Sequence, residues 1–205
     1  MLAIGMALIC ALAVSLDLLR HPQKMWIMDL VWPVSMLYLG PLGLWIYWRI
    51  GRASGGGNTL SWQAALKGSL HCGAGCTVGD FIGEWLVFLL GVTVLGSDLL
   101  AKYVFAFILA YAFGIFFQYF SIAPMRHLSP GAGIVAALKA DTLSLAAFEV
   151  GMFVWMAVTQ KLLLPGIEPT SVEYWFMMQL AMILGLATTL PVNAWLIRKG
   201  WKERM

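Results

Sequence analysis

A histidine, two cysteines and two acids stand close together in an apolar part of the chain, in the stretch HCGAGCTVGDFIGE. Four of these residues recur at intervals of four: Cys72, Cys76, Asp80 and Glu84. On a helix this spacing places them along one slanting stripe. Thiolates and imidazole are ligands that suit copper(I), and they also bind zinc. The pattern therefore predicts a soft-metal site, with the expected ligands His71, Cys72, Cys76 and Asp80.

A second row of small residues runs beside this stripe at the same spacing: Gly75, Gly79 and Gly83. Small residues four apart let a neighbouring membrane helix approach closely, either within the chain or in a homo-oligomer. The polar stripe is then expected to face protein rather than lipid. Because an unpaired charge at membrane depth costs several kcal/mol, Asp80 and Glu84 need partners, protons or cations.

The two thiols have two further interpretations. Cys72 and Cys76 form a redox dithiol in one of them, although three residues separate them rather than the two of a thioredoxin-type motif. In the other they are small side chains that pack beside glycines. Neighbouring residues on a helix point about 100° apart, so His71, Cys72 and Cys76 cannot all bind one ion from an ideal helix. A local break in the helix, or a ligand from another span, would resolve this geometry. Gly73 weakens the helix at this point.

A later apolar stretch, KADTLSLAAFEVGMFVWMA, also carries acids. Acids inside membrane helices are functional by default, so we expect Glu84, Asp141 and Glu149 to form an ion path or proton relay. The alternative interpretation is that Asp141 only pairs with Lys139 or with an interhelical donor such as Thr142. Four residues are candidate additional site members, although methionine is also common packing material: His127, Met152, Met156 and Asn193.

The composition identifies the class of protein that holds these residues. The chain has 205 residues, of which 61% are hydrophobic and 11% charged, whereas a soluble domain averages about 25% charged residues. The apolar runs are long and do not alternate, so they predict helices rather than barrel strands. We expect an all-α, polytopic transmembrane helical bundle that forms a single domain, with about six spans at residues 2–19, 27–48, 67–96, 99–122, 133–158 and 174–197.

Lysine and arginine predict the orientation in the membrane. The predicted spans place on one side the residues Arg49, Arg52, Lys67, Arg126, Arg198, Lys199, Lys202 and Arg204. This side is assigned to the cytoplasm, so both termini are expected there, in a cytoplasmic (inner) membrane. Arg20 and Lys24 then fall on the opposite side. The basic tail is expected at the membrane surface. The net charge of +3 gives no reason to expect nucleic acid as a partner.

Four segments together resemble an uncharacterised family of prokaryotic membrane proteins, a domain of unknown function. They are HCGAGCTVGDFIGEW, FQYFSIAPMR, KADTLSLAAFEVGMFVWMA and LPVNAWLIRKG, so the resemblance covers residues from about 60 to 205. It implies a fold and no assigned activity. Within these motifs lie His71, Cys72, Cys76, Asp80, Asp141, Glu149 and Asn193.

The leading hypothesis is an integral membrane protein that binds a soft transition metal for transport, sequestration or sensing. Copper(I) is favoured, and zinc is the alternative; this hypothesis does not make the chain an enzyme. The main rival is a thiol-disulfide or quinone-linked membrane oxidoreductase that uses Cys72 and Cys76. A third hypothesis is haem b held by His71 and His127, and a fourth is a structural assembly subunit. The chain has no Walker motif for ATP binding.

Overall fold

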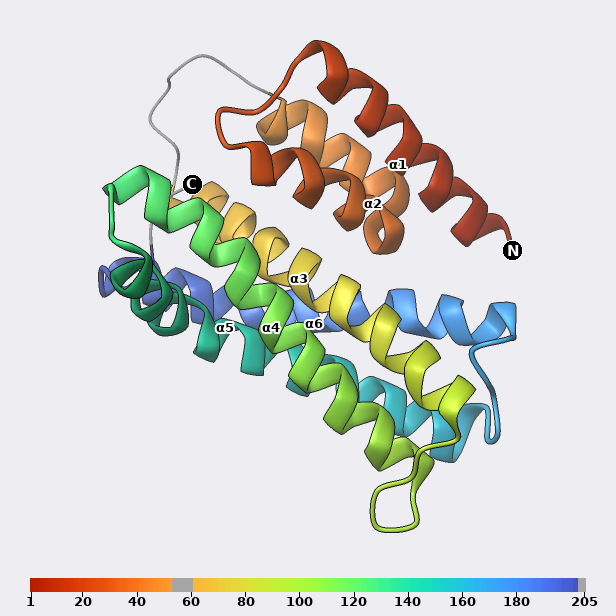
Figure 1. Ribbon diagram of the computed structural model, residues 1–205. Helices are drawn as coiled ribbons and strands as arrows, with labels where there is room; N and C mark the ends of the chain where they lie inside the picture. The colour runs from red at the N-terminus through yellow and green to blue at the C-terminus, as the bar shows by residue number, and fades with distance from the viewer. Residues whose placement is uncertain (53–60, 203–205) are drawn as a thin grey trace.

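The computed structural model describes residues 1–52 and 61–202, and this part of the chain is almost entirely helical (Figure 1). Its helices are α1 (Leu2–Arg20), α2 (Trp26–Ile46), α3 (Ser61–Leu90), α4 (Asp98–Arg126), α5 (Pro130–Val158) and α6 (Val172–Arg198). Short π-helical turns extend α2 and α5 at Tyr47–Gly51 and Thr159–Leu163. In the described ranges, six helices are long and apolar enough to cross a membrane, which confirms the predicted all-α transmembrane bundle. The connector expected at residues 52–60 lies outside the described residues, except for Arg52.

Helix α3 begins and ends about six residues earlier than the predicted span 67–96. It ends at Leu90 because Gly91 takes a positive φ of 61°, which glycine adopts at no steric cost. Ser97 then caps α4, and its hydroxyl accepts a hydrogen bond from the Leu100 N–H at 3.2 Å. The 30 residues of α3 extend about 45 Å, more than the roughly 30 Å of the hydrocarbon core. This helix therefore tilts or extends beyond the lipid.

Helix α2 folds back on itself at Gly40, where φ is +52° and ψ is −129°. Glycine permits this conformation, and Pro41 next to it has no N–H to continue the first limb. The two limbs lie side by side, since the rings of Trp32 and Tyr47 are 5.3 Å apart between centroids. Gly51 lies directly against the Trp32 indole. We call this segment, residues 26–51, the α2 hairpin.

The α2 hairpin returns the chain to the end of the bundle where α1 finishes. The Tyr47 hydroxyl donates a hydrogen bond to Asp17 Oδ2 at 2.7 Å, and Arg52 Nη2 lies 3.1 Å from Asp17 Oδ1. Helices α3 to α6 then run alternately, so the start of α1 and the end of α6 lie at opposite ends of the bundle (Figure 1). Six straight helices would instead have brought these two points to the same end of the bundle, and the difference arises because the predicted span 27–48 turns back at Gly40.

The predicted glycine row on α3 packs against α4 of the same chain. A methyl group at Gly75 would lie 2.8 Å from Gly114 Cα, and one at Gly83 would lie 2.9 Å from Ala106 N. Between them, a methyl group at Gly79 would collide with the backbone of Ala110. The two helices are therefore in backbone contact over two turns, and this contact turns the polar stripe away from lipid.

Candidate functional site

The polar stripe of α3 lies entirely inside the protein. At most 3% of the surface of any of these residues is exposed: His71, Cys72, Cys76, Asp80 and Glu84. The stripe lies among α4, α5, α6 and the α2 hairpin, as Figure 1 shows for the helices. A row of titratable side chains thus runs along the interior of the bundle.

At one end of this row, Asp141 on α5 pairs with Lys202 from the C-terminal tail. Lys202 Nζ lies 3.0 Å from Asp141 Oδ1, and both side chains have no exposed surface. The ammonium group also donates to Ser144 Oγ at 3.2 Å, and the Ser144 hydroxyl donates to Asp141 Oδ1 at 2.9 Å. Asp141 is therefore held in a buried ion pair with a hydroxyl beside it.

This partner of Asp141 differs from the two partners that the alternative interpretation of the sequence named. Lys139 instead places its ammonium group 5.0 Å from the ring centroid of Trp201, and the Thr142 hydroxyl donates to Leu138 O. The tail reaches the interior because Gly200 adopts a positive φ of 69° just after α6. The expectation that the basic tail lies at the membrane surface is therefore wrong for Lys202.

Asn193, near the end of α6, bridges α6 to α3. Its side-chain amide donates to Ser69 Oγ at 2.8 Å and to Thr189 Oγ1 at 3.3 Å. Asn193 Oδ1 is buried and has no hydrogen-bond partner among the described residues. This oxygen lies in the region of Lys202, since a methyl group at Gly68 would be 3.9 Å from Asn193 Oδ1 and 3.5 Å from Lys202 Cε. Asn193 thus joins the surroundings of the ion pair.

His71 faces α4 rather than the two cysteines. Its Nε2 lies 2.7 Å from Ser121 Oγ, and its ring meets Phe117 edge-on at 6.0 Å. Helix α3 is regular through this stretch, so the local break considered near Gly73 is not observed. His71 is also close enough to Asp141 and Lys202 to interact with both charges. The imidazole thus belongs with the ion pair.

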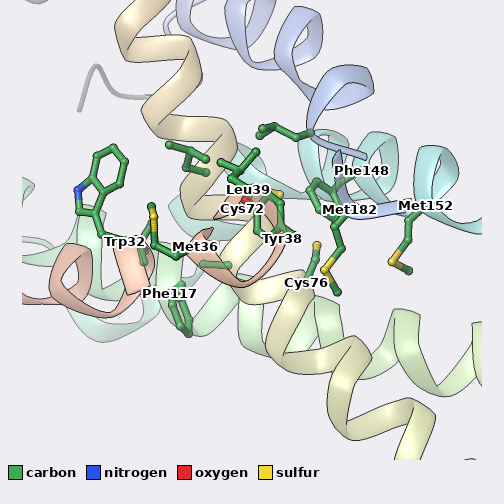
Figure 2. Close-up of a cluster of buried hydrophobic side chains, with 14 of the residues drawn as sticks. Trp32, Met36, Tyr38, Leu39, Cys72, Cys76, Phe117, Phe148, Met152 and Met182 are labelled. Atoms are coloured by element: carbon green, nitrogen blue, oxygen red, sulfur yellow. The ribbon is translucent and has the colours of Figure 1, made fainter. Parts of the chain in front are cut away.

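The two thiols lie in the middle of the bundle, and Figure 2 shows them among Tyr38, Met182 and Met152. Both cysteines are free and completely buried, and the thiols interact with each other. The Cys76 thiol also lies beside the Glu149 carboxylate, although this contact does not have the geometry of a hydrogen bond.

Asp80 and Glu149 have no hydrogen-bond partner in the described part of the chain, for either oxygen of either side chain. Their exposed fractions are 0% and 1%. Asp80 interacts electrostatically with both Glu149 and Glu84. Three acids therefore share a buried region, and Lys102 is the lysine that lies beside it. At least two of the acids must be neutralised by protons or by a bound cation, because several unpaired buried charges are too costly.

Glu84 lies at the far end of the row, opposite the end formed by Asp141. Its Oε2 lies 3.8 Å from Lys102 Nζ, and both side chains are about 95% buried. The same ammonium group stands 5.1 Å from the ring centroid of Tyr174 on α6. Sequence reasoning did not include Lys102 in the site. The position of Lys102 at the start of an apolar run could have indicated its role, because a lone lysine inside a membrane helix needs an acid as its partner.

The α2 hairpin places its tip against the thiols. At Gly73, next to Cys72, a methyl group would lie 2.9 Å from the Tyr38 hydroxyl. Gln179 on α6 donates to the Leu37 carbonyl at 2.7 Å, which satisfies one of the free carbonyls at the end of the first limb. Interrupted helices at membrane depth occur where the backbone is buried in protein or lines a cavity. In transporters such half-helix ends face bound ions.

The remaining predicted site residues take different places. Within the described part of the chain, no three of the His, Cys, Asp and Glu side chains converge as metal ligands do. His127 is exposed at the end of α4, whereas His71 is buried, so the two do not share a pocket. Met152 and Met156 are buried in the apolar core around α5.

Comparison with known proteins identifies a family but assigns no activity. The model of one family, described as a domain of unknown function (DUF4396), matches residues 61–202. Neither curated proteins nor solved structures give a match. The matched region holds α3 to α6 and Lys202, which carry the buried row described above.

Proposed function

The chain belongs to the DUF4396 family, and from this premise we propose that it moves a cation across a membrane through the bundle interior. The observation that carries the proposal is the buried row of titratable side chains between two lysines. The row begins at Asp141 beside Lys202, passes the thiols and ends at Glu84 beside Lys102. Charged groups at membrane depth mark ion and proton paths in membrane proteins.

The proton is the cation that this geometry supports best. Asp80 and Glu149 are buried carboxyl groups without hydrogen-bond partners in the described ranges, so no hydrogen bond to another described side chain competes with a proton on either group. When neighbouring acids cannot all be ionised together, at least one of them holds a proton. The tip of the α2 hairpin beside Cys72 supports this reading, since half-helix ends face ions in transporters.

A soft metal ion is the second candidate, and the contact of Cys76 with both Cys72 and Glu149 favours it. Copper(I) prefers thiolate ligands, and the buried cysteines offer two of them on successive turns of one helix. Of the ligands expected from the sequence, the two thiols are the ones retained in this candidate, because His71 is turned towards Ser121. Zinc remains the alternative metal.

We place the C-terminal end of the bundle in the cytoplasm and the N-terminal end on the opposite face of an inner membrane. Because the α2 hairpin does not cross, the cytoplasmic end gains Arg20 and Lys24, which the expected topology placed on the wrong side. The same end carries Arg49, Arg52, Lys67, Arg126, Arg198 and Lys199. Cytoplasmic ends of membrane proteins are rich in lysine and arginine, as this arrangement requires.

The proposal is tested by reconstituting the purified protein in liposomes and measuring proton flux. A potassium gradient with valinomycin sets the membrane potential, and an enclosed pH-sensitive dye reports proton entry. We expect flux above that of empty liposomes, and a loss of at least tenfold in Glu149→Gln. The matched control is Glu173→Gln, which removes an exposed acid at the start of α6 and is expected to keep the wild-type rate. Equal flux in Glu149→Gln and wild type would contradict the proposed path.

The metal candidate has a separate test. Protein purified under reducing conditions is analysed for copper and zinc beside the double variant Cys72→Ser/Cys76→Ser. The control is Cys10→Ser, which changes the buried cysteine of α1 outside the row. About one metal ion per chain in wild type and control, absent in the double variant, would favour metal as the cargo. Metal-free protein in all three leaves the proton as the transported cation.

A further inference from the structure

We infer that Asp141, Ser144 and Asn193 form a binding site for a small ammonium-like cation, and that the chain's own Lys202 occupies this site until a free cation displaces it. The inference deepens the proposed function, on which it rests, because the site lies at the cytoplasmic end of the same row. It assigns that end a ligand class: monovalent cations that donate hydrogen bonds.

The oxygen atoms around Lys202 exceed what its ammonium group uses. Nζ contacts Asp141 Oδ1 at 3.0 Å and Ser144 Oγ at 3.2 Å. Two further acceptors, Asp141 Oδ2 and Asn193 Oδ1, are buried in the same region without partners in the described structure. An ammonium group offers three hydrogen bonds and a free ammonium ion offers four. The surplus acceptors therefore suit a cation with more donors than a lysine has.

Lys202 reaches this site from a short segment that follows α6 and is not itself helical. Helix α6 ends at Arg198, and the turn at Gly200 directs the next residues inwards. The backbone N–H groups of Trp201 and Lys202 both donate to the Leu196 carbonyl, at 3.0 and 3.4 Å. The lysine stem packs against α3 at Gly68, where a methyl group would lie 3.5 Å from Lys202 Cε.

The charges around the site make binding an exchange rather than an addition. Asp141 and Lys202 together carry no net charge, and His71 on α3 is close enough to interact with both. A second cation beside Lys202 would leave a net positive charge in a buried region, which is costly. Entry of one cation therefore requires the ammonium group of Lys202 to leave.

The experiment replaces the tethered ammonium group by a free one. The Lys202→Met variant keeps an unbranched stem and lacks the charged end, so an ammonium ion has room beside Asp141. Thermal unfolding in detergent, followed by tryptophan fluorescence, is measured against ammonium chloride concentration. We expect a saturable rise in the unfolding temperature of Lys202→Met, since a ligand that binds only the folded state stabilises it. Tetramethylammonium chloride is the control, because this ion donates no hydrogen bond.

Three further samples decide the inference. Wild type is expected to need at least tenfold more ammonium for the same response, because its tethered lysine competes. The variant Asp141→Asn/Lys202→Met is expected not to respond, and Lys202→Ala, with more space, is expected to respond to methylammonium. No ammonium-specific rise in either single variant would overturn the inference and leave a purely structural ion pair. The unfolding temperature does not depend on proton flux, so this experiment can refute the cation site without refuting the proposed transport, and the flux assay can do the reverse.

Discussion

Replacing Gly79 with alanine is expected to destabilise the protein strongly, because this glycine is the point of closest approach between α3 and α4. A methyl group there would meet backbone atoms of Ala110 at less than contact distance, and the Leu109 carbonyl carbon at 2.6 Å. Backbone atoms within a helix cannot rotate away as a side chain can. The two helices must therefore move apart, which separates the polar stripe from its surroundings.

The magnitude follows from two opposing terms. Overpacking of a filled interior costs about 1–3 kcal/mol, and the rigid backbone on both sides places Gly79→Ala at the upper end of that range. Alanine is favoured over glycine in a helix by about 1 kcal/mol, which offsets part of this cost. The net loss is therefore about 2 kcal/mol. On the scale of globular proteins of this size, this lowers the unfolding temperature by roughly 4–8 °C.

The assay is thermal unfolding in detergent with Gly131→Ala as the matched control. Gly131 also lies in a helix, on α5, and a methyl group there would have no neighbour within 4 Å. The control keeps only the helix-propensity term, so its unfolding temperature is expected to stay level or rise. The proton flux of Gly79→Ala is expected to fall as well. Equal unfolding temperatures for the two variants would refute the backbone contact between α3 and α4.

Three other perturbations test the buried pairs. Asp141→Asn alone is expected to lower the free energy of unfolding by about 3–5 kcal/mol, because it leaves Lys202 unpaired. The double variant Asp141→Asn/Lys202→Met is expected to recover most of this loss when the variants are compared by thermal unfolding. Additive losses would contradict the ion pair. Lys102→Met is expected to lower the unfolding temperature less than Asp141→Asn does, because the ions are 3.8 Å apart, and to recover in combination with Glu84→Gln. Ser121→Ala removes the hydrogen-bond partner of the buried His71 imidazole and is expected to lower the free energy of unfolding by about 1–3 kcal/mol. An unchanged unfolding temperature would contradict that contact.

The amino-acid sequence alone was sufficient for the helical class of the protein and for the polar stripe. Long apolar runs predict membrane helices because the backbone must satisfy its own hydrogen bonds in lipid. The four-residue spacing from Cys72 to Glu84 predicts one helix face, since the geometry of a helix is local. The burial of that face also follows from the sequence, because the glycines beside it let a neighbouring helix pack closely. The structure agrees at each of these points.

Which residues meet across the bundle was decided only by the tertiary structure. Asp141 and Lys202 are 61 positions apart, and a local pattern cannot say which helix ends become neighbours. The same holds for His71, whose neighbour on the sequence is Cys72 but whose partner is Ser121 on α4. Gly40 and Pro41 indicate a break in the helix, but the contact of Trp32 with Tyr47 decides that the chain turns back. That single turn sets the side on which every later helix begins, because a hairpin returns the chain to the end from which it entered.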